Sequence, residues 1–121
     1  MHLHDIQNRT VEVGTEVFGE AGMISRQERL YRLAEEMLEL LRTAGLTYNQ
    51  LSTMAAHEYF DRKPGELSQE VAGVQCTLLS FADAHGIETE AVTLIELQRV
   101  LDKKDLCRAK HAAKPMFARA V

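Results

Sequence analysis

The chain has 121 residues, a net charge of −4 and 45% hydrophobic residues, with no tryptophan. This length fits one domain, or one domain with a tail, whose core is built from aliphatic side chains. The acidic balance argues against a protein that coats nucleic acid, and no apolar run has the length of a membrane span or the form of a signal peptide. We therefore expect a soluble, cytoplasmic protein.

The N-terminal segment, residues 1–23, predicts one short helix from about residue 5 to residue 18. Ile6, Thr10, Val13 and Val17 recur there at helical spacing, although a glycine interrupts the pattern. Two further glycines, at positions 19 and 22, indicate a turn.

The next helix has the clearest signals. Ser25 is a favourable N-cap, and Glu28 three residues later completes the pattern of a capping box. Gly45 marks the end of this helix. Its apolar residues recur every three or four positions and predict one inward face: Leu30, Leu33, Ala34, Met37, Leu40, Leu41 and Ala44.

Two more helices follow, from Thr47 as N-cap to about residue 60 and from about residue 66 to residue 84. Pro64 lies in the turn between them. The second of these helices has no charged residue between positions 71 and 82, so it is apolar on nearly all sides and should be buried on several. We expect Cys76 to be a buried, reduced thiol, and we infer that a partner subunit covers this helix.

A fifth helix is predicted from about Thr89, and the sequence leaves open whether it continues through residues 103–105. The tail after it is basic and includes Pro115. No alternating or β-branched run indicates a strand. The pattern therefore predicts an all-α protein, with an N-terminal segment (1–23), a helical domain (24–106) and a basic C-terminal tail (107–121).

Four carboxylates on two predicted helices are the best candidates for chemistry. Glu35, Glu36 and Glu39 lie three or four residues apart on the helix that begins near Ser25, and Glu70 lies near the start of the apolar helix. Several carboxylates without a histidine or cysteine near them suit Mg²⁺ or Mn²⁺ better than Zn²⁺. The alternative for the three clustered acids is a solvated face, and for Glu70 a position at the rim of the helix start. A buried Glu70 would have to be paired, protonated or bound to a metal.

Three segments carrying these residues resemble the MazG-like all-α nucleoside triphosphate pyrophosphohydrolases, especially the small phage-type members. They read LAEEMLELLRTAGL, GELSQEVAGVQCTLLSFADAHGI and RAKHAAKP. The resemblance implies a bundle of four or five helices that assembles into a homodimer or homotetramer. It also implies Mg²⁺-dependent cleavage of (deoxy)nucleoside triphosphates between the α and β phosphates, which yields a monophosphate and pyrophosphate.

The resemblance assigns site residues by position in the family motifs, EExxE followed by ExxD. The metal ligands fall on Glu36, Glu39 and Glu70, and Glu35 is an auxiliary acid that orients or deprotonates water. The aspartate of ExxD falls on Gly73, so one carboxylate of the family pattern is missing. The natural phosphate contacts in the tail are Arg108, Lys110 and Lys114; their alternative is a solvated basic tail.

Two other functions remain open. A degenerate relative could bind a nucleotide or a protein partner without turnover, which the missing aspartate at Gly73 favours. A structural helical dimer or small regulator is also possible. A helix-turn-helix over residues 47–81 would place an apolar helix where base-reading side chains belong, so no nucleic-acid partner is expected.

Overall fold

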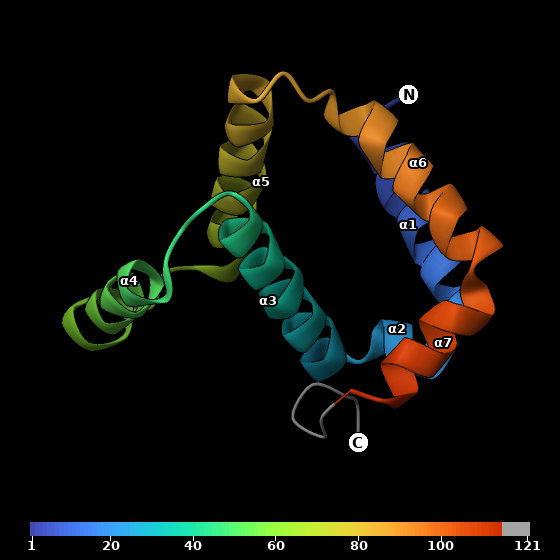
Figure 1. Cartoon of the computed structure of the whole chain (residues 1–121), viewed down its shortest axis with the longest axis horizontal. Helices are drawn as coiled ribbons and strands as arrows, with labels where there is room; N and C mark the ends of the chain where they lie inside the picture. Colours follow the sequence, from blue (N-terminus) through green and yellow to red (C-terminus); the bar gives the residue numbers. More distant parts are fainter. Residues whose placement is uncertain (115–121) are drawn as a thin grey trace. The chain divides into compact units, whose positions relative to one another are not determined.

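The computed structural model describes residues 1–114, which form seven α-helices and no strand (Figure 1). The all-α prediction is therefore confirmed for this part of the chain. The chain divides into two compact units: residues 1–35 with the chain from residue 88 onward, and residues 36–87. In order, the helices are α1 (Leu3–Phe18), α2 (Glu20–Ile24), α3 (Arg26–Thr43), α4 (Tyr48–Asp61), α5 (Leu67–Ala84), α6 (Thr89–Asp102) and α7 (Lys104–Ala112).

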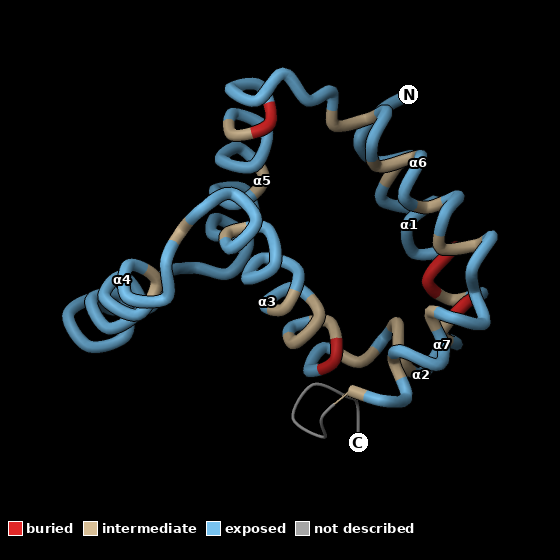
Figure 2. The backbone as a smooth tube through the Cα atoms, viewed as in Figure 1, coloured by how far each residue is buried: buried red, intermediate tan, exposed pale blue. Residues whose placement is uncertain are grey.

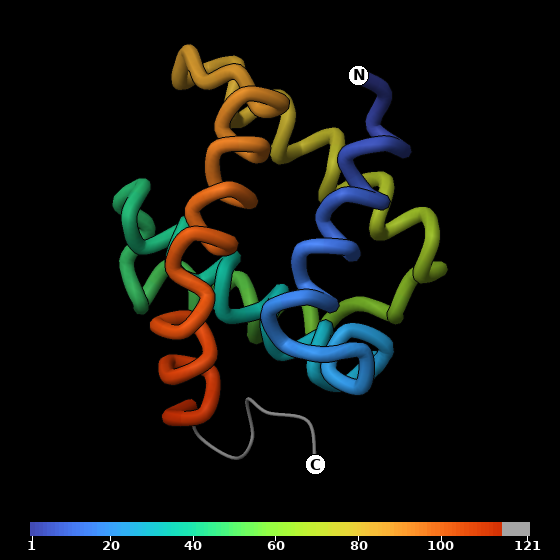
Figure 3. The backbone as a smooth tube through the Cα atoms, turned by 90° about the vertical axis from the view of Figure 1, so that its right-hand side faces the viewer, coloured from blue at the N-terminus to red at the C-terminus, as the bar shows by residue number. Residues whose placement is uncertain are grey.

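The first unit is organised around α1, which packs against α2, α6 and α7. Figures 1 and 3 both show α1 and α6 side by side. Val13 and Val17 of α1 are 1% and 2% exposed and form the centre of this packing. The helix continues through Gly14, and the missing side chain there leaves room for Met23 of α2, because a β-carbon at Gly14 would force the Met23 thioether to move.

The sequence left open whether the fifth helix continues through residues 103–105, and the structure places a break at Lys103, where the backbone leaves the helical region before α7 begins. The described part of the predicted basic tail is therefore helical as far as Ala112. Pro115 and the residues after it lie outside the described part. Among residues 1–114, no helix has the length and apolar character that crossing a membrane requires.

In the second unit, local signals set the helix ends. A glycine with φ +103°, Gly45, follows the end of α3. Gly45 N–H donates to the Arg42 carbonyl oxygen and Leu46 N–H to the Leu41 carbonyl oxygen, which are the paired bonds of a Schellman motif. Thr47 caps α4 through the N–H of Gln50 at 3.2 Å, and the Gln50 side chain accepts from Thr47 N–H at 2.9 Å. The predicted cap at Thr47 and the glycine stop are both confirmed.

Apolar side chains of the second unit remain exposed in the single chain, and Figure 2 shows α4 and α5 almost entirely in the exposed colour. Ala82 is the only buried residue described in this unit. The exposed set on α5 includes Leu67, Val71, Val74, Leu78 and Leu79, which are 41–80% exposed. The apolar stripe predicted to be the inward face of α3 also contains exposed leucines, at positions 30, 33 and 40.

Three expectations from the sequence are wrong in the single chain. Cys76 is exposed, because no described element covers that side of α5. Gly22 belongs to the short helix α2 and does not form a turn, whereas Gly19, with φ +87°, does end α1. The capping box at Ser25 is only half formed: Glu28 N–H donates to Ser25 Oγ at 3.2 Å, but the Glu28 carboxylate pairs with a different residue, described below.

Two glycine substitutions should have opposite effects on stability. Gly45→Ala places a β-carbon at φ +103° and should lower the free energy of unfolding by about 1 kcal/mol. Gly73→Ala lies within α5 with nothing near its added β-carbon, and should raise that free energy by about 0.5–1 kcal/mol through helix propensity. Urea unfolding followed by circular dichroism measures both. A destabilising Gly73→Ala would contradict an open environment at this position.

Candidate functional site

The three clustered acids lie on α3, but in different surroundings. Glu36 and Glu39 are exposed and belong to the second unit, one helical turn apart. Glu35 is half-buried in the first unit. No hydrogen bond or ion pair within residues 1–114 involves the Glu39 carboxylate. The Glu39 carboxylate is therefore available to a ligand or to another chain.

Glu70 lies in the first turn of α5 and is exposed. Glu70 is therefore not buried in the single chain, and its place agrees with the alternative of a position at the rim of the helix start. Its carboxylate folds back towards Gly65, where an added β-carbon would collide with Glu70 Oε1. The backbone N–H groups at this helix start are capped by another acid, Glu66, which accepts from Ser68 N–H at 3.1 Å and Gln69 N–H at 2.8 Å.

The predicted metal ligands do not meet around one point in the single chain. Among residues 1–114, no three histidine, cysteine, aspartate or glutamate side chains come together so as to hold a cation. The chemistry of the predicted donors, three carboxylates, nevertheless suits Mg²⁺. The magnesium site at Glu36, Glu39 and Glu70 therefore stays a prediction, and one that needs a further chain or a different arrangement of the acids.

Glu35 is engaged by two cations of the first unit. It forms an ion pair with Lys114 and a second one with Arg32 at 3.5 Å. The hydrogen bond from Lys114 lowers the pKa of the Glu35 carboxyl below its ordinary value, the charges of Lys114 and Arg32 act in the same direction, and partial burial opposes them. The pair therefore stabilises the fold above the ordinary titration range of a glutamate, and this contribution is lost as the pH falls through the lowered pKa.

The lowered pKa also bears on the predicted role of Glu35 in deprotonating water. A carboxylate with a lower pKa is a weaker base, so the pairing with Lys114 makes Glu35 less suited to accept a proton from water. It remains suited to orient a water molecule or to hold Lys114 in place.

The three basic residues predicted to contact phosphate differ in their surroundings. Arg108 donates to the carbonyl oxygens of Val17 at 2.7 Å and Glu16 at 3.1 Å, so it satisfies the C-terminal end of α1. Lys114 forms an ion pair with Glu35. Lys110 is exposed, and no ion pair within residues 1–114 involves it. Of the three, Lys110 is the side chain that is most available to an anion.

The most buried charged group of the described chain, Glu28, was not among the site residues that the sequence predicted. The Glu28 side chain is 2% exposed, and its Oε1 lies 2.8 Å from Nε2 of His111 on α7. Arg29 Nη2 lies 3.8 Å from the same oxygen, and the Phe18 ring lies 5.4 Å from the His111 ring. One feature of the sequence indicated that Glu28 and Glu35 face the same surroundings: they are seven residues apart and so share a face of α3. The capping-box pattern gave Glu28 a different partner.

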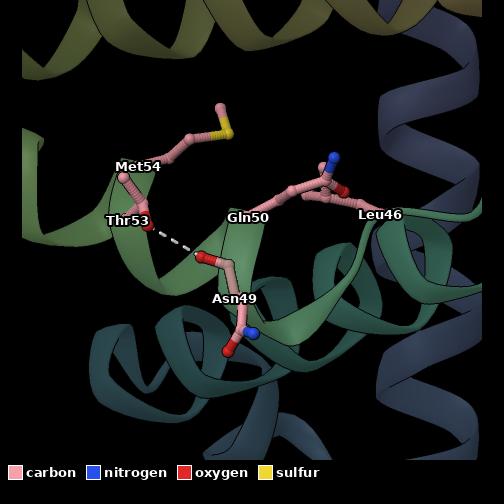
Figure 4. Close-up of a pocket in the computed structure, with 5 residues that line it drawn as sticks. All are labelled: Leu46, Asn49, Gln50, Thr53 and Met54. Atoms are coloured by element: carbon pink, nitrogen blue, oxygen red, sulfur yellow. Dashed lines mark hydrogen bonds between the residues drawn. The ribbon is translucent and has the colours of Figure 1, made fainter.

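Two hollows lie in the second unit. One, of about 460 Å³, is lined by Leu46, Asn49, Gln50, Thr53 and Met54. In Figure 4 these side chains do not point to a common centre, and the Thr53 hydroxyl donates to the Asn49 carbonyl of its own helix. A second hollow, of about 450 Å³, lies between the end of α3 and the start of α4. Neither is lined by a group of acids, so neither identifies a catalytic site.

Comparison of the chain with protein-family models, with curated proteins and with solved structures gives no match.

Proposed function

We propose that this chain is a Mg²⁺-dependent nucleoside triphosphate pyrophosphohydrolase that resembles the MazG-like enzymes and acts in the cytoplasm as a homodimer or homotetramer. The observation that carries the proposal is the set of exposed acids on two helices of the second unit. Glu36 and Glu39 lie one turn apart on α3, and Glu70 lies in the first turn of α5. Carboxylates exposed in this way can meet those of another chain around one cation.

The oligomer is part of the proposal because the second unit leaves its apolar side chains uncovered. Burying a Leu or Val side chain of α5 would contribute about 1.5–3 kcal/mol relative to leaving it exposed. Exposed apolar patches of this kind are typical of interaction surfaces. A second copy that covers α5 would bury this face, and it would bring further acids to the same region.

In the proposed reaction, water attacks a phosphorus of the α–β phosphate linkage, and the bridging P–O bond breaks to give a monophosphate and pyrophosphate. Bound Mg²⁺ would supply neutralisation of the phosphate charge and a position for the water. Glu36, Glu39 and Glu70 would hold the ion through carboxylate oxygens. Glu35 would act as the auxiliary acid that orients water, and Lys110 would contact a phosphate oxygen.

The experiment is an assay of pyrophosphate release from a panel of ribo- and deoxyribonucleoside triphosphates, with Mg²⁺, with Mn²⁺ and with EDTA. We expect stoichiometric monophosphate and pyrophosphate with either metal, and none with EDTA. Release of inorganic phosphate and a diphosphate would indicate a different reaction. The absence of any product at high protein concentration would contradict the proposal.

The alternative is a catalytically degenerate MazG-like oligomer that binds a nucleotide or a protein partner. Gly73 favours it, because the resemblance places an aspartate there and a glycine has no side chain to ligate a metal. This alternative predicts that a nucleotide raises the melting temperature while no product forms. Under it, Gly73→Asp should create activity where the wild-type chain has none.

A further inference from the structure

The C-terminal helix α7 presents a row of basic side chains to the rest of the first unit. Arg108 and His111 lie three residues apart on one face of α7, and Lys114 follows after the same interval. Each binds a different acceptor: Arg108 the end of α1, His111 Glu28 and Lys114 Glu35. The His111 link therefore joins α7 to the first half of α3, and the Lys114 link joins the residues just after α7 to the same helix.

The link between His111 and Glu28 depends on the charge of the imidazole. The Glu28 side chain is 2% exposed, so its carboxylate has lost most of its hydration, and a buried carboxylate needs a compensating charge. His111 Nε2 approaches Glu28 Oε1 at 2.8 Å, but this oxygen accepts no well-aligned hydrogen bond within residues 1–114. A neutral imidazole in this position would leave the Glu28 carboxylate without its nearest counter-charge.

We propose that α7 is a pH-sensitive latch: protonated His111 holds α7 over the buried Glu28 carboxylate, and loss of that proton loosens the packing of α7 against α3. Histidine is the type of side chain whose charge ordinarily changes near neutral pH, and the latch opens as the pH rises because the imidazole then loses its proton. The inference rests on the packing of the first unit and holds whether or not the chain hydrolyses nucleotides.

The other charged groups around His111 do not change charge in the range near neutral pH. On α3, Arg29 lies near Glu28 at 3.8 Å, and Glu35 carries the pair with Lys114. The packing helix α1 presents the Phe18 ring, and within residues 1–114 no charged side chain of α1, α2 or α6 pairs with His111 or Glu28. Arginine and lysine side chains keep their charge across this range, and the pKa of Glu35 is lowered away from it.

Two contacts that do not involve the His111 imidazole limit how far α7 can move in the open state. Arg108 still donates to the α1 carbonyl oxygens, and Lys114 still pairs with Glu35. The release is therefore a local loosening of α7 beside α3, and α7 does not leave the first unit. This loosening exposes the Glu28 carboxylate to water and restores the hydration that the carboxylate lost on burial.

The test is hydrogen–deuterium exchange of the full chain, read by mass spectrometry on the peptide that covers α7 and corrected for the intrinsic pH dependence of exchange. In the wild type, the protection of this peptide should fall about tenfold between about pH 6 and pH 8. A peptide covering α5 serves as the internal reference, because α5 belongs to the other unit.

Two variants separate the latch from a general effect of pH. His111→Gln removes the titrating group, so α7 should be loosened equally at both pH values. Glu28→Gln removes the buried charge, so α7 should stay protected at both. His57→Gln is the matched control: His57 pairs with Asp61 at 3.2 Å on the surface of α4, and its loss should leave the wild-type profile unchanged.

Equal protection of the wild-type α7 peptide at the two pH values would overturn the proposal. So would a His111→Gln variant that keeps the wild-type pH dependence. If His111→Gln fails to fold, Glu28→Gln decides alone: a pH-dependent loss of protection in that variant would also overturn the proposal.

Discussion

Replacing Leu78 with aspartate is expected to convert an oligomer of this chain into monomers. Leu78 lies on α5, is 41% exposed in the single chain and shares its helix with four other exposed Leu and Val side chains. In a symmetric oligomer the substitution acts once in every copy, so it removes several buried leucines and places charges in an apolar interface. The dissociation constant should rise by at least about 100-fold.

Size-exclusion chromatography with light scattering measures this effect. Ser80→Asp is the matched control, because it adds the same charge to an exposed position on the same helix, about 200° away from Leu78. It should leave the oligomer intact. A wild-type chain that is monomeric at all concentrations would contradict the expectation, and so would a Leu78→Asp variant with the wild-type mass.

Replacing Glu39 with glutamine is expected to abolish pyrophosphate release without unfolding the chain. The amide keeps the size of the side chain but removes the negative charge that a Mg²⁺ ligand supplies, so kcat should fall by at least about 100-fold. Because Glu39 makes no ion pair or hydrogen bond within residues 1–114, the stability of the single chain should not change measurably.

The matched control is Glu58→Gln, which removes a carboxylate from the exposed surface of α4, where Glu58 pairs with Arg62 at 3.4 Å. It should keep full activity. Raising the Mg²⁺ concentration should partly restore the activity of a Glu39→Gln variant if the residue is a metal ligand. Full pyrophosphate release by Glu39→Gln would remove this residue from the proposed site.

The oligomer and the reaction are separate expectations with separate outcomes. A Leu78→Asp variant that is monomeric and inactive, beside an active wild type, would show that the acids act only in the assembled protein. A monomeric variant that keeps its activity would place all the reacting groups on one chain. The pH-sensitive latch of α7 is read by hydrogen exchange and does not depend on either result.

The helices and most of their ends could be predicted from the sequence because their causes are local. Hydrophobic spacing, a cap at Thr47 and a glycine after α3 act within a few residues, and the structure confirms each of them. Gly14 shows the limit of this reasoning. It weakened the prediction of α1, whereas in the structure it makes room for Met23, a contact nine residues further along the chain.

The pairing of charged side chains was decided by the tertiary structure. Glu28 and His111 are 83 positions apart, and Glu35 and Lys114 are 79 apart, so no local pattern joins them. The capping box offered Glu28 a neighbouring partner, but in the packed fold the Glu28 carboxylate lies against the His111 ring, 2.8 Å from Nε2. Local propensity thus determined where the helices lie, and the path of the chain determined which charges meet.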